Sequence, residues 1–299
     1  MEFVVEATEP WIRELQLGRL LGKGGQSEIY YAEHPERGVP LAVKVIREID
    51  FLDRFERFRL EFACLNRLHH PSVVAPYGIG TSTLQDDDAP LPSLVMEFAG
   101  DYNLKQRVNY SPLLVREAVL YAIHLGRALD YVHSQREPVI HRDVNPKNVM
   151  VDKDNIIRLV DFGLVKPSAG VIKEDSNMMA GTSHYVSPEQ IADAASVDHR
   201  TDIYGAGMTL FFMLTNSTMF SDRLSIGETI RKYSESPHTP PSRFNDAVTK
   251  GLDEVVLTAV EQDRDKRFPS ARAFVGALRE VYLGELVRNG KDEALVYEG

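Results

Sequence analysis

The sequence predicts an α+β protein of two lobes, a small lobe rich in β-strands and a larger lobe that is mainly helical. The chain has 299 residues, the length of one large domain or of two lobes of ordinary size. Short apolar runs of strand length occupy its first part, whereas apolar residues recur at helical spacing from about Tyr102 onward. We place the lobes at about 12–97 and 103–286, joined by a hinge at about 97–102 and followed by a polar tail at 287–299.

In the small lobe, apolar runs predict strands and one apolar periodicity predicts a helix. The expected strands are Leu17–Leu21, Ile29–Ala32, Leu41–Ile46 and Ser93–Glu97. The helix is expected at about Leu52–Leu68, with one face formed by Phe51, Phe55, Phe58, Phe62, Leu65 and Leu68. The acidic insert Leu84–Leu91 is interpreted as an exposed hairpin tip or, alternatively, as an acidic docking site.

In the larger lobe, the clearest local signal is Ser111-Pro112, a helix N-cap followed by proline at the first helical position. It predicts a long helix that ends near Ser134. Further helices are expected near Thr201–Leu214, Ser225–Tyr233, Val248–Glu261 and Ser270–Leu286. Short strands are expected around His141–Val151 and Ile156–Val160.

Charge and cysteine content exclude several classes of function. The chain carries 34 basic and 44 acidic residues, a formal net charge of −10 without a long basic run, which argues against binding to nucleic acid or to an anionic membrane. Its single cysteine, Cys64, excludes an internal disulfide and a multi-cysteine zinc site. The amino terminus does not resemble a signal peptide, and no apolar stretch reaches the roughly 20 residues of a membrane helix. We therefore expect a cytoplasmic protein without a membrane segment.

Two features of the small lobe are suited to binding an anion. The glycine-rich turn LGKGGQSEI at 21–29 lets backbone N–H groups approach a phosphate, although alone it describes an ordinary tight turn equally well. Lys44 lies in the apolar strand run LAVK, where a charge needs an anion or a carboxylate partner. Glu61 on the following helix is the candidate partner, unless it is simply a solvated glutamate.

Two motifs in the middle of the chain are more specific than the glycine-rich turn and the strand lysine. The string HRDVNPKN at 141–148 is followed, after a short strand, by DFG at 161–163. Either HRD or DFG can arise by chance, but not both in order after a glycine loop and a strand lysine. From about Trp11 to Leu286 the sequence resembles the eukaryotic-like (Hanks-type) protein serine/threonine kinase catalytic domain, in its bacterial form. The resemblance implies the bilobal protein kinase fold, ATP and Mg²⁺ as cofactors, and phosphorylation of serine or threonine in protein substrates, this chain included.

The resemblance also implies a set of nucleotide-binding residues. Those expected to cover the phosphates are Leu21, Gly22, Lys23, Gly24 and Gly25, with Ser27 where the family usually has a third glycine. Lys44 is expected to hold the α- and β-phosphates and to pair with Glu61. Those expected around the base and the ribose are Ile29, Ala42 and Met150 on the ring faces, Met96 as gatekeeper, Glu97 and Ala99 as the hinge hydrogen-bonding residues, and Asn103 at the ribose.

For catalysis, the resemblance implies that Asp143 is the base and that Asn148 and Asp161 bind Mg²⁺, which prefers hard oxygen ligands. The chain departs from the family at Asn145, where serine/threonine kinases have a lysine that touches the γ-phosphate. Lys147 either substitutes for that lysine or is a solvated loop residue. The departure leaves a pseudokinase, or a weakly active nucleotide-binding scaffold, as the alternative function.

The second half of the chain favours a protein substrate. Residues 181–189, GTSHYVSPE, resemble the substrate-docking segment of serine/threonine kinases. Thr182 is expected to hydrogen-bond near the catalytic aspartate, Asp202 to brace the catalytic loop, and Arg267 to pair with Glu189. A small-molecule kinase that shares the fold generally lacks these features.

Arg142, beside the catalytic aspartate, is typical of kinases whose activation loop is ordered by a phosphate. Ser176 is the expected site of autophosphorylation. Its neighbours Glu174 and Asp175 would already supply part of the negative charge to Arg142.

Overall fold

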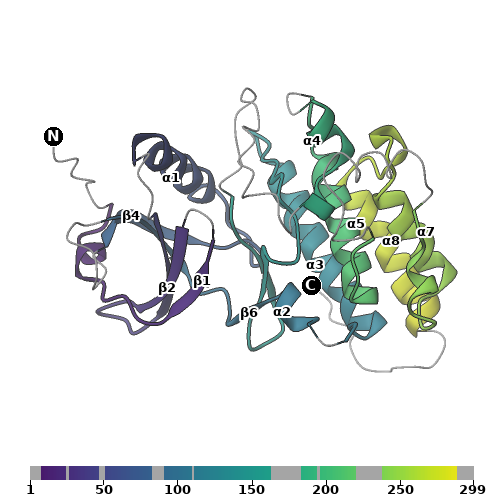
Figure 1. The fold of residues 1–299 in the computed structure, drawn as a ribbon, viewed down its shortest axis with the longest axis horizontal. Coiled ribbons are helices and arrows are strands. Elements are labelled where there is room, and N and C mark those ends of the chain that lie inside the picture. Colours follow the sequence, from purple (N-terminus) through teal and green to yellow (C-terminus); the bar gives the residue numbers. More distant parts are fainter. Residues whose placement is uncertain are drawn as a thin grey trace. The chain divides into compact units, whose positions relative to one another are not determined.

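The computed structural model describes residues 8–24, 27–46, 51–82, 91–109, 111–162, 183–193, 196–219 and 238–287. The chain divides into two compact units. The first comprises Met1–Tyr102 and Met150–Val165, and the second comprises Asn103–Val149 and Lys166–Gly299. Figure 1 shows the fold coloured along the sequence. The expected helix Ser225–Tyr233 lies outside the described residues, as do residues 84–90 of the expected hairpin tip Leu84–Leu91, whose last residue begins a strand.

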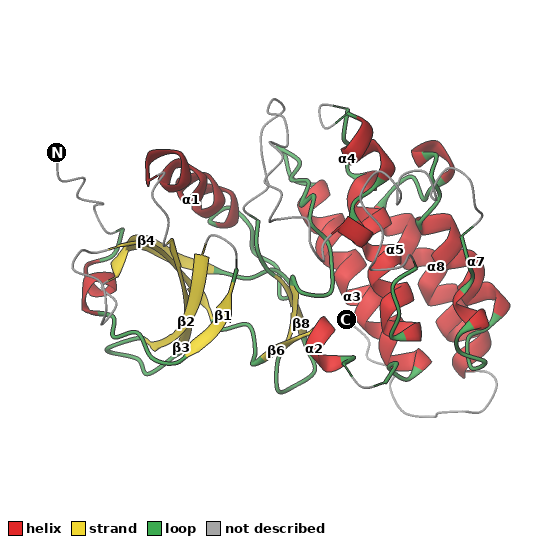
Figure 2. Cartoon of the chain, viewed as in Figure 1, coloured by secondary structure: helices red, strands yellow, loops and turns green. Residues whose placement is uncertain are grey.

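The first unit contains a five-stranded antiparallel sheet, shown in yellow in Figure 2. Its strands are β1 (Leu20–Lys23), β2 (Ser27–Glu33), β3 (Pro40–Ile46), β4 (Pro76–Ser82) and β5 (Leu91–Glu97), in the order β1-β2-β3-β5-β4. The four predicted strands are present with shifted ends. Together with the helices of the second unit, this sheet confirms the predicted α+β class.

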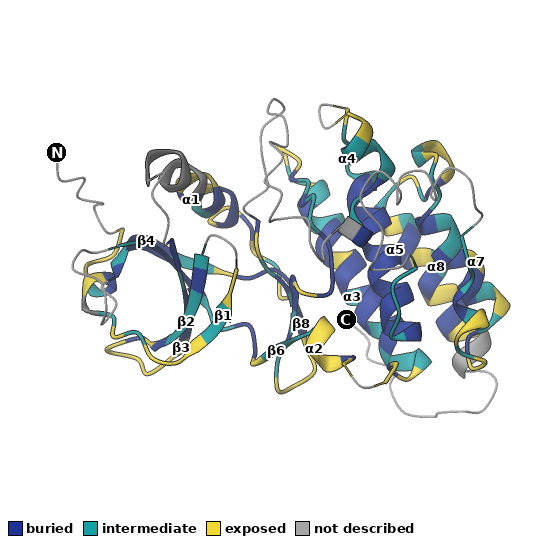
Figure 3. Ribbon diagram, in the orientation of Figure 1, coloured by how far each residue is buried: buried dark blue, intermediate teal, exposed yellow. Residues whose placement is uncertain are grey.

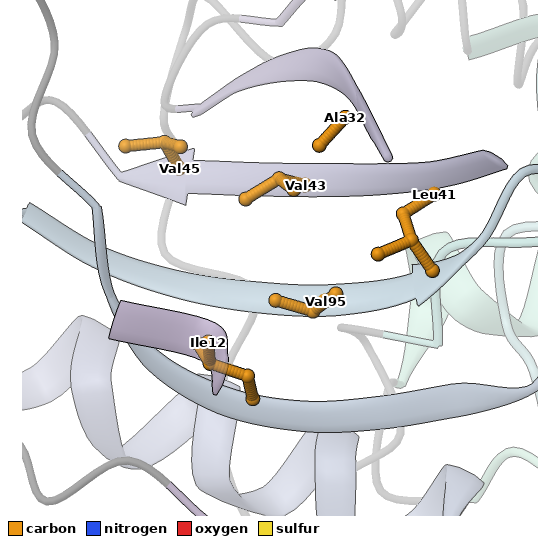
Figure 4. Packing of buried hydrophobic residues seen from close by; sticks show 6 residues of the cluster. All are labelled: Ile12, Ala32, Leu41, Val43, Val45 and Val95. Carbon is orange, nitrogen blue, oxygen red and sulfur yellow. The ribbon is translucent and has the colours of Figure 1, made fainter. Parts of the chain in front are cut away.

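Strand β4 was not predicted, because its sequence PYGIGTS contains a proline and two glycines, which interrupt the strand pattern. It forms through pairing with β5 and through the short 3-10 helix η1 (Pro10–Glu14) that packs on it. Gly78 lets η1 approach closely, since an added Cβ would lie 2.6 Å from the end of the Ile12 side chain, which would have to move. Figure 4 shows Ile12 with the buried core of the sheet, which also includes Ala32, Leu41, Val43, Val45 and Val95.

Helix α1 (Phe51–Leu65) begins where the apolar periodicity predicts and ends before the predicted Leu68. Phe58, Leu65 and Leu68 are buried, so the predicted apolar face continues into the turn after the helix. The helix contacts β4 and β5. It carries Glu61, which is also buried.

A three-stranded sheet contains β6 (Tyr102–Asn103), β7 (Val149–Val151) and β8 (Ile157–Leu159), in the order β6-β7-β8. The expected strand structure around His141–Val151 is limited to its last three residues. Residues 141–148 form a loop, because side chains satisfy much of its backbone and Arg142 adopts a left-handed φ of 66°. The segment after β7 packs with the first unit, where Val73 forms a parallel bridge with Leu159.

The second unit is helical. Its described α-helices are α2 (Leu104–Arg107), α3 (Val115–His133), α4 (Pro188–Ala192), α5 (Arg200–Thr215), α7 (Lys250–Ala259) and α8 (Ala271–Val281), and a π-helical turn η5 (Tyr282–Val287) follows α8. Three 3-10 turns accompany them, η2 (Ser183–Tyr185), η3 (Pro241–Arg243) and η4 (Arg264–Lys266). Helix α5 is the core of this unit: it contacts α3, α7 and α8 and is coloured as buried along its length in Figure 3.

The predicted start of the long helix is wrong. Helix α3 begins at Val115, with Leu114 in the N-cap position and no side-chain cap, instead of at Ser111-Pro112. The backbone N–H of Leu113 donates to the carbonyl of Met213 in α5, and the Leu113 side chain is buried. This tertiary bond holds the preceding residues out of the helix. Among the described residues, no helix combines the length and apolar character that crossing a bilayer requires.

Candidate active site

In the first unit, Lys44 forms a cluster with two carboxylates. Its Nζ lies 2.9 Å from Glu61 Oε2 and 2.8 Å from Asp161 Oδ1. Lys44 comes from β3, Glu61 from α1, and Asp161 from the segment that follows β8. The side chains of Lys44 and Glu61 are 11% and 3% exposed, whereas that of Asp161 is 46% exposed. The predicted pairing of Lys44 with Glu61 is therefore present, and Asp161 joins it.

The cluster fixes the charge of Lys44. Burial by itself lowers the pKa of the ammonium group, but Asp161 and Glu61 outweigh that effect and hold the pKa above its ordinary value. Burial raises the pKa of the Glu61 carboxyl; Lys44 opposes this effect and the charge of Asp161 adds to it. When both carboxylates are ionised, two negative charges share one positive charge. A cation beside the exposed carboxylate would therefore be stabilised.

The backbone at Asp161 is in the left-handed region, with φ of 67°. This conformation is uncommon for residues other than glycine, although aspartate and asparagine tolerate it best. The next residue, Phe162, is completely buried, so packing holds this segment in place. Unusual backbone conformations of this kind occur preferentially at functional sites.

At the end of β5, the side chain of the expected hinge residue Glu97 is held on two sides. Its Oε1 accepts a hydrogen bond of 3.0 Å from the Ala75 N–H and lies 3.2 Å from Arg158 Nε. Arg158 in turn binds Asp152 at 2.6 Å. These contacts connect the strand end to the β7–β8 hairpin and orient Glu97.

The residues expected around the base and ribose differ in their surroundings. Met96, Ala42 and Ala99 are buried, and Ile29 and Met150 are half-buried. Gly100, which follows them, has φ of 131°, and an added Cβ would lie 2.3 Å from the Val151 carbonyl oxygen. The chain therefore requires glycine there. Asn103 caps α2 with its side-chain oxygen, which accepts from Gln106 N at 3.0 Å, so its expected ribose contact stays a prediction.

The glycine-rich turn connects β1 and β2. Gly24 N donates to Ser27 O at 2.8 Å, and the space around Gly22 is open, with no atom within 4 Å of an added Cβ. Leu21 is half-buried in β1. Lys23 forms an ion pair with Glu28 at 3.0 Å. Three expected site residues, Gly25, Ser176 and Thr182, lie outside the described part of the chain.

In the second unit, two amides hold the carboxylate of Asp143. Asn145 Nδ2 donates to Asp143 Oδ1 and Asn148 Nδ2 donates to Asp143 Oδ2, each at 2.7 Å. Both asparagine side chains are buried. Lys147 is exposed, and no described residue forms an ion pair with its ammonium group.

Asp202 of α5 braces the loop that carries Asp143, as predicted. Its carboxylate accepts from the N–H groups of His141 and Arg142, each at 2.8 Å, and it lies 2.8 Å from His133 Nε2. Burial acts to raise the pKa of the Asp202 carboxyl, but the hydrogen bond from His133 and the other donors outweigh it, so the pKa is lowered. The ionised carboxylate thus holds the left-handed turn at Arg142.

Helix α4 connects to the same loop. The predicted ion pair between Arg267 and Glu189 is confirmed, with two N–O distances of 2.6 and 2.8 Å and a fully buried Arg267 side chain. Gln190, which we did not single out, donates to the Arg142 carbonyl at 2.8 Å. Ser187 and Gln190 have the spacing of a helix capping box, which they form in the structure. The sequence could therefore have placed Gln190 in the first turn of α4.

The donor atoms suit magnesium and a nucleotide. Because the Asn148 amide nitrogen faces Asp143, its oxygen is the atom that remains for a cation, and no described residue donates to that oxygen. Asp161 supplies a carboxylate, also a hard oxygen ligand. Within the described residues, no group of three or more His, Cys, Asp or Glu side chains could hold a metal ion. In each unit by itself, a magnesium ion would need oxygen ligands beyond this one residue, and the phosphates of a nucleotide are oxygen ligands of that kind.

Comparison with known proteins agrees with this set of residues. The sequence profile of the protein kinase domain matches residues 15–276. The serine/threonine-protein kinase PknB of Mycolicibacterium smegmatis is 34% identical over 275 residues, which cover 90% of this chain and 43% of that protein. A probable serine/threonine-protein kinase of Streptomyces coelicolor is 33% identical over 261 residues, 86% of this chain and 38% of its own length. The chain thus spans less than half the length of these relatives.

Proposed function

The chain belongs to the protein kinase domain family, and from this we propose that it is an ATP- and magnesium-dependent protein serine/threonine kinase. The observation that carries the proposal is the buried Lys44–Glu61 ion pair with Asp161, together with an Asp143 carboxylate held by two amides. The names of the relatives support a serine or threonine acceptor. We also propose that the substrates are proteins, including this chain itself, and that it acts in the cytoplasm.

In this proposal, the first unit binds the nucleotide. Lys44, kept charged by its two carboxylate neighbours, binds the α- and β-phosphates. Glu61 prevents the ammonium group from moving away, and the turn that carries Gly22 and Gly24 covers the phosphates, with the Gly24 N–H held by Ser27 O within the turn. Ala42, Met96 and Ala99 line the apolar position of the adenine, with Glu97 and Ala99 as its hydrogen-bonding residues.

The second unit supplies the base. Asp143 orients the attacking hydroxyl and accepts its proton. Asn148 and Asp161 hold magnesium, which, when bound, offsets the charge that develops on the transferred phosphoryl group. Lys147 is the candidate for the positive charge near the γ-phosphate that Asn145 does not provide. Asn145 is also the sole basis of the pseudokinase alternative, and Lys44, Asp143, Asn148 and Asp161 argue against that function.

We propose that activation acts through Arg142. Its Nε is buried and has no hydrogen-bond partner among the described residues. A phosphate on Ser176 would provide an anion for this guanidinium. Because Glu174 and Asp175 lie beside Ser176, we expect Ser176→Ala to reduce activity only several-fold, and neutral replacement of both acidic residues to make activity depend more strongly on Ser176. Phosphosite mapping and activity assays of these variants test this.

The central test is incubation of the purified protein with labelled ATP, Mg²⁺ and a mixed protein acceptor, followed by phosphosite mapping. We expect label on serine and threonine, none in the presence of excess EDTA, and none with Asp143→Asn or Lys44→Met. The matched controls Asp246→Asn and Lys266→Met change exposed residues of the same types and should retain full transfer. Near-normal turnover of Asp143→Asn at saturating ATP would contradict the proposal.

A further inference from the structure

Both polar atoms of the Asn145 side chain form hydrogen bonds in the loop around Asp143. Its Nδ2 donates to Asp143 Oδ1 at 2.7 Å and to the Asp143 carbonyl at 3.1 Å. Its Oδ1 accepts from the Lys147 N–H at 2.9 Å. The residue is 2% exposed. The side chain at the position of the family's lysine therefore has a defined role in this chain.

We propose that Asn145 is a positioning residue that orients the Asp143 carboxylate for proton transfer. The inference rests on the proposed kinase function. Asn145 holds one carboxylate oxygen and Asn148 holds the other, so two donors, two and five residues after Asp143, set the plane of the carboxylate. A base held in this way needs no reorganisation when the hydroxyl arrives.

Only an amide can form both hydrogen bonds of this position. The Lys147 N–H needs an acceptor and Asp143 Oδ1 needs a donor, and an asparagine of fixed orientation satisfies both. An alanine would leave the buried loop without both bonds. A lysine supplies a donor to Asp143 but no acceptor for Lys147 N. Positioning of the base is thus compatible with either asparagine or lysine, whereas the bond to Lys147 N is specific to asparagine.

Replacing Asn145 by aspartate tests its bond to Asp143 separately from its bond to the Lys147 N–H. Asn145→Asp is almost isosteric and keeps an acceptor for the Lys147 N–H, but it places a second carboxylate at the position of the donor. Two carboxylates at hydrogen-bonding distance repel each other, so the Asp143 carboxylate loses the donor that fixes its plane. We therefore expect Asn145→Asp to slow the transfer step and to leave the binding of ATP almost unchanged.

Asn245 provides a matched control. It has the same local pattern, with Oδ1 accepting from the N–H two residues later, at Ala247, but its Nδ2 donates to the Leu214 backbone carbonyl instead of to a carboxylate. Asn245→Asp thus tests the general cost of exchanging such a donor for an acceptor.

The first experiment measures steady-state phosphoryl transfer from ATP to a serine peptide, taken from the sites mapped above. We expect Asn145→Asp to lower kcat at least tenfold and to leave the KM for ATP within threefold of the wild type. Asn145→Lys, which keeps a donor toward Asp143, should recover part of that loss, and Asn245→Asp should match the wild type in both parameters. An unchanged kcat in Asn145→Asp, or an equal loss in Asn145→Lys and Asn145→Asp, would overturn the inference.

A second measurement does not depend on activity. In protein labelled with ¹⁵N, the side-chain amide signal of Asn145 is assigned by its absence in Asn145→Asp. We expect this signal to shift in Asp143→Asn, which replaces its acceptor, and to stay in place in the control Asp246→Asn. If the wild type transferred no phosphate, the proposed function would fail, and this spectrum would still decide whether Asn145 binds Asp143. An unshifted signal in Asp143→Asn overturns the positioning role.

Discussion

At the scale of single residues, the energetics of the site are governed by charges that are buried and paired. Lys44 is the clearest case, because it neutralises Glu61, which is almost inaccessible to water, and also contacts the more exposed Asp161. Removing one partner of a buried pair is far more costly than removing both, since the remaining charge is left without compensation. We therefore expect consequences for stability as well as for activity.

We predict that Lys44→Met destabilises the protein by about 3 kcal/mol at pH 8 and by less at pH 5. Without Lys44 the pKa of Glu61, already raised by burial, rises further. A carboxyl whose folded-state pKa lies above its unfolded-state value loses stability as the pH rises from the unfolded pKa to the folded one. Urea unfolding at the two pH values measures this effect. The double variant Lys44→Met with Glu61→Gln should lose the pH dependence; if it does not, Glu61 is not its source.

Lys147 allows a cleaner test of chemistry than Lys44. It is exposed and forms no ion pair with a described residue, so its replacement should leave stability within about 0.5 kcal/mol. If it supplies charge to the γ-phosphate, Lys147→Ala lowers turnover at least tenfold, which corresponds to about 1.4 kcal/mol of transition-state stabilisation. Adding Asn145→Lys should restore part of the rate. Unchanged steady-state kinetics of Lys147→Ala would identify a solvated loop residue.

At the scale of elements, close packing between helices decides which glycines are required. Gly126 of α3 faces α8, where an added Cβ would lie 2.5 Å from Val275 Cγ2. Gly276 of α8 is exposed, and an added Cβ would meet nothing within 4 Å. Both residues lie inside helices, so their intrinsic helix propensities are the same and only the tertiary surroundings differ.

We therefore predict opposite effects of the same substitution. Gly276→Ala should raise the free energy of unfolding by about 0.5–1 kcal/mol, because alanine favours the helix and restricts the unfolded chain. Gly126→Ala should lower it by about 1–3 kcal/mol, because α3 and α8 must separate to accommodate the methyl group. Chemical denaturation of both variants tests the pair. Equal effects of the two substitutions would show that α3 and α8 do not pack as described.

At the scale of the whole molecule, the chain consists of two compact units, and Arg267 holds together several parts of the second. Its guanidinium binds Glu189 and the backbone carbonyls of Glu261, Gln262 and Arg200, and it lies 4.9 Å from the centre of the Tyr204 ring. These contacts join α4, α5 and the segment between α7 and α8. The pair also lowers the pKa of Glu189 against the effect of burial.

We predict that Arg267→Met destabilises the second unit by about 3–5 kcal/mol, because it leaves Glu189 without its cation. Hydrogen exchange of the α5, α7 and α8 amides should accelerate, while that of β2, β3 and β5 stays unchanged. Arg272→Met is the control, since Arg272 pairs with Asp130 through a side chain that is 80% exposed and should contribute little. Equal acceleration in both units would mean that the chain unfolds as one cooperative unit.

The sequence by itself determined the class of fold, most strands of the small sheet and the family, because local periodicity and ordered motifs are written in consecutive residues. The pairs Lys44–Glu61 and Glu189–Arg267 followed from the family resemblance. The tertiary structure alone decided where α3 begins, because a bond from Leu113 to Met213 outweighs the local capping signal of Ser111. It also decided that β4 is a strand and that Asn145 holds the carboxylate of Asp143. These outcomes depend on partners that no local pattern specifies, and only packing brings those partners together.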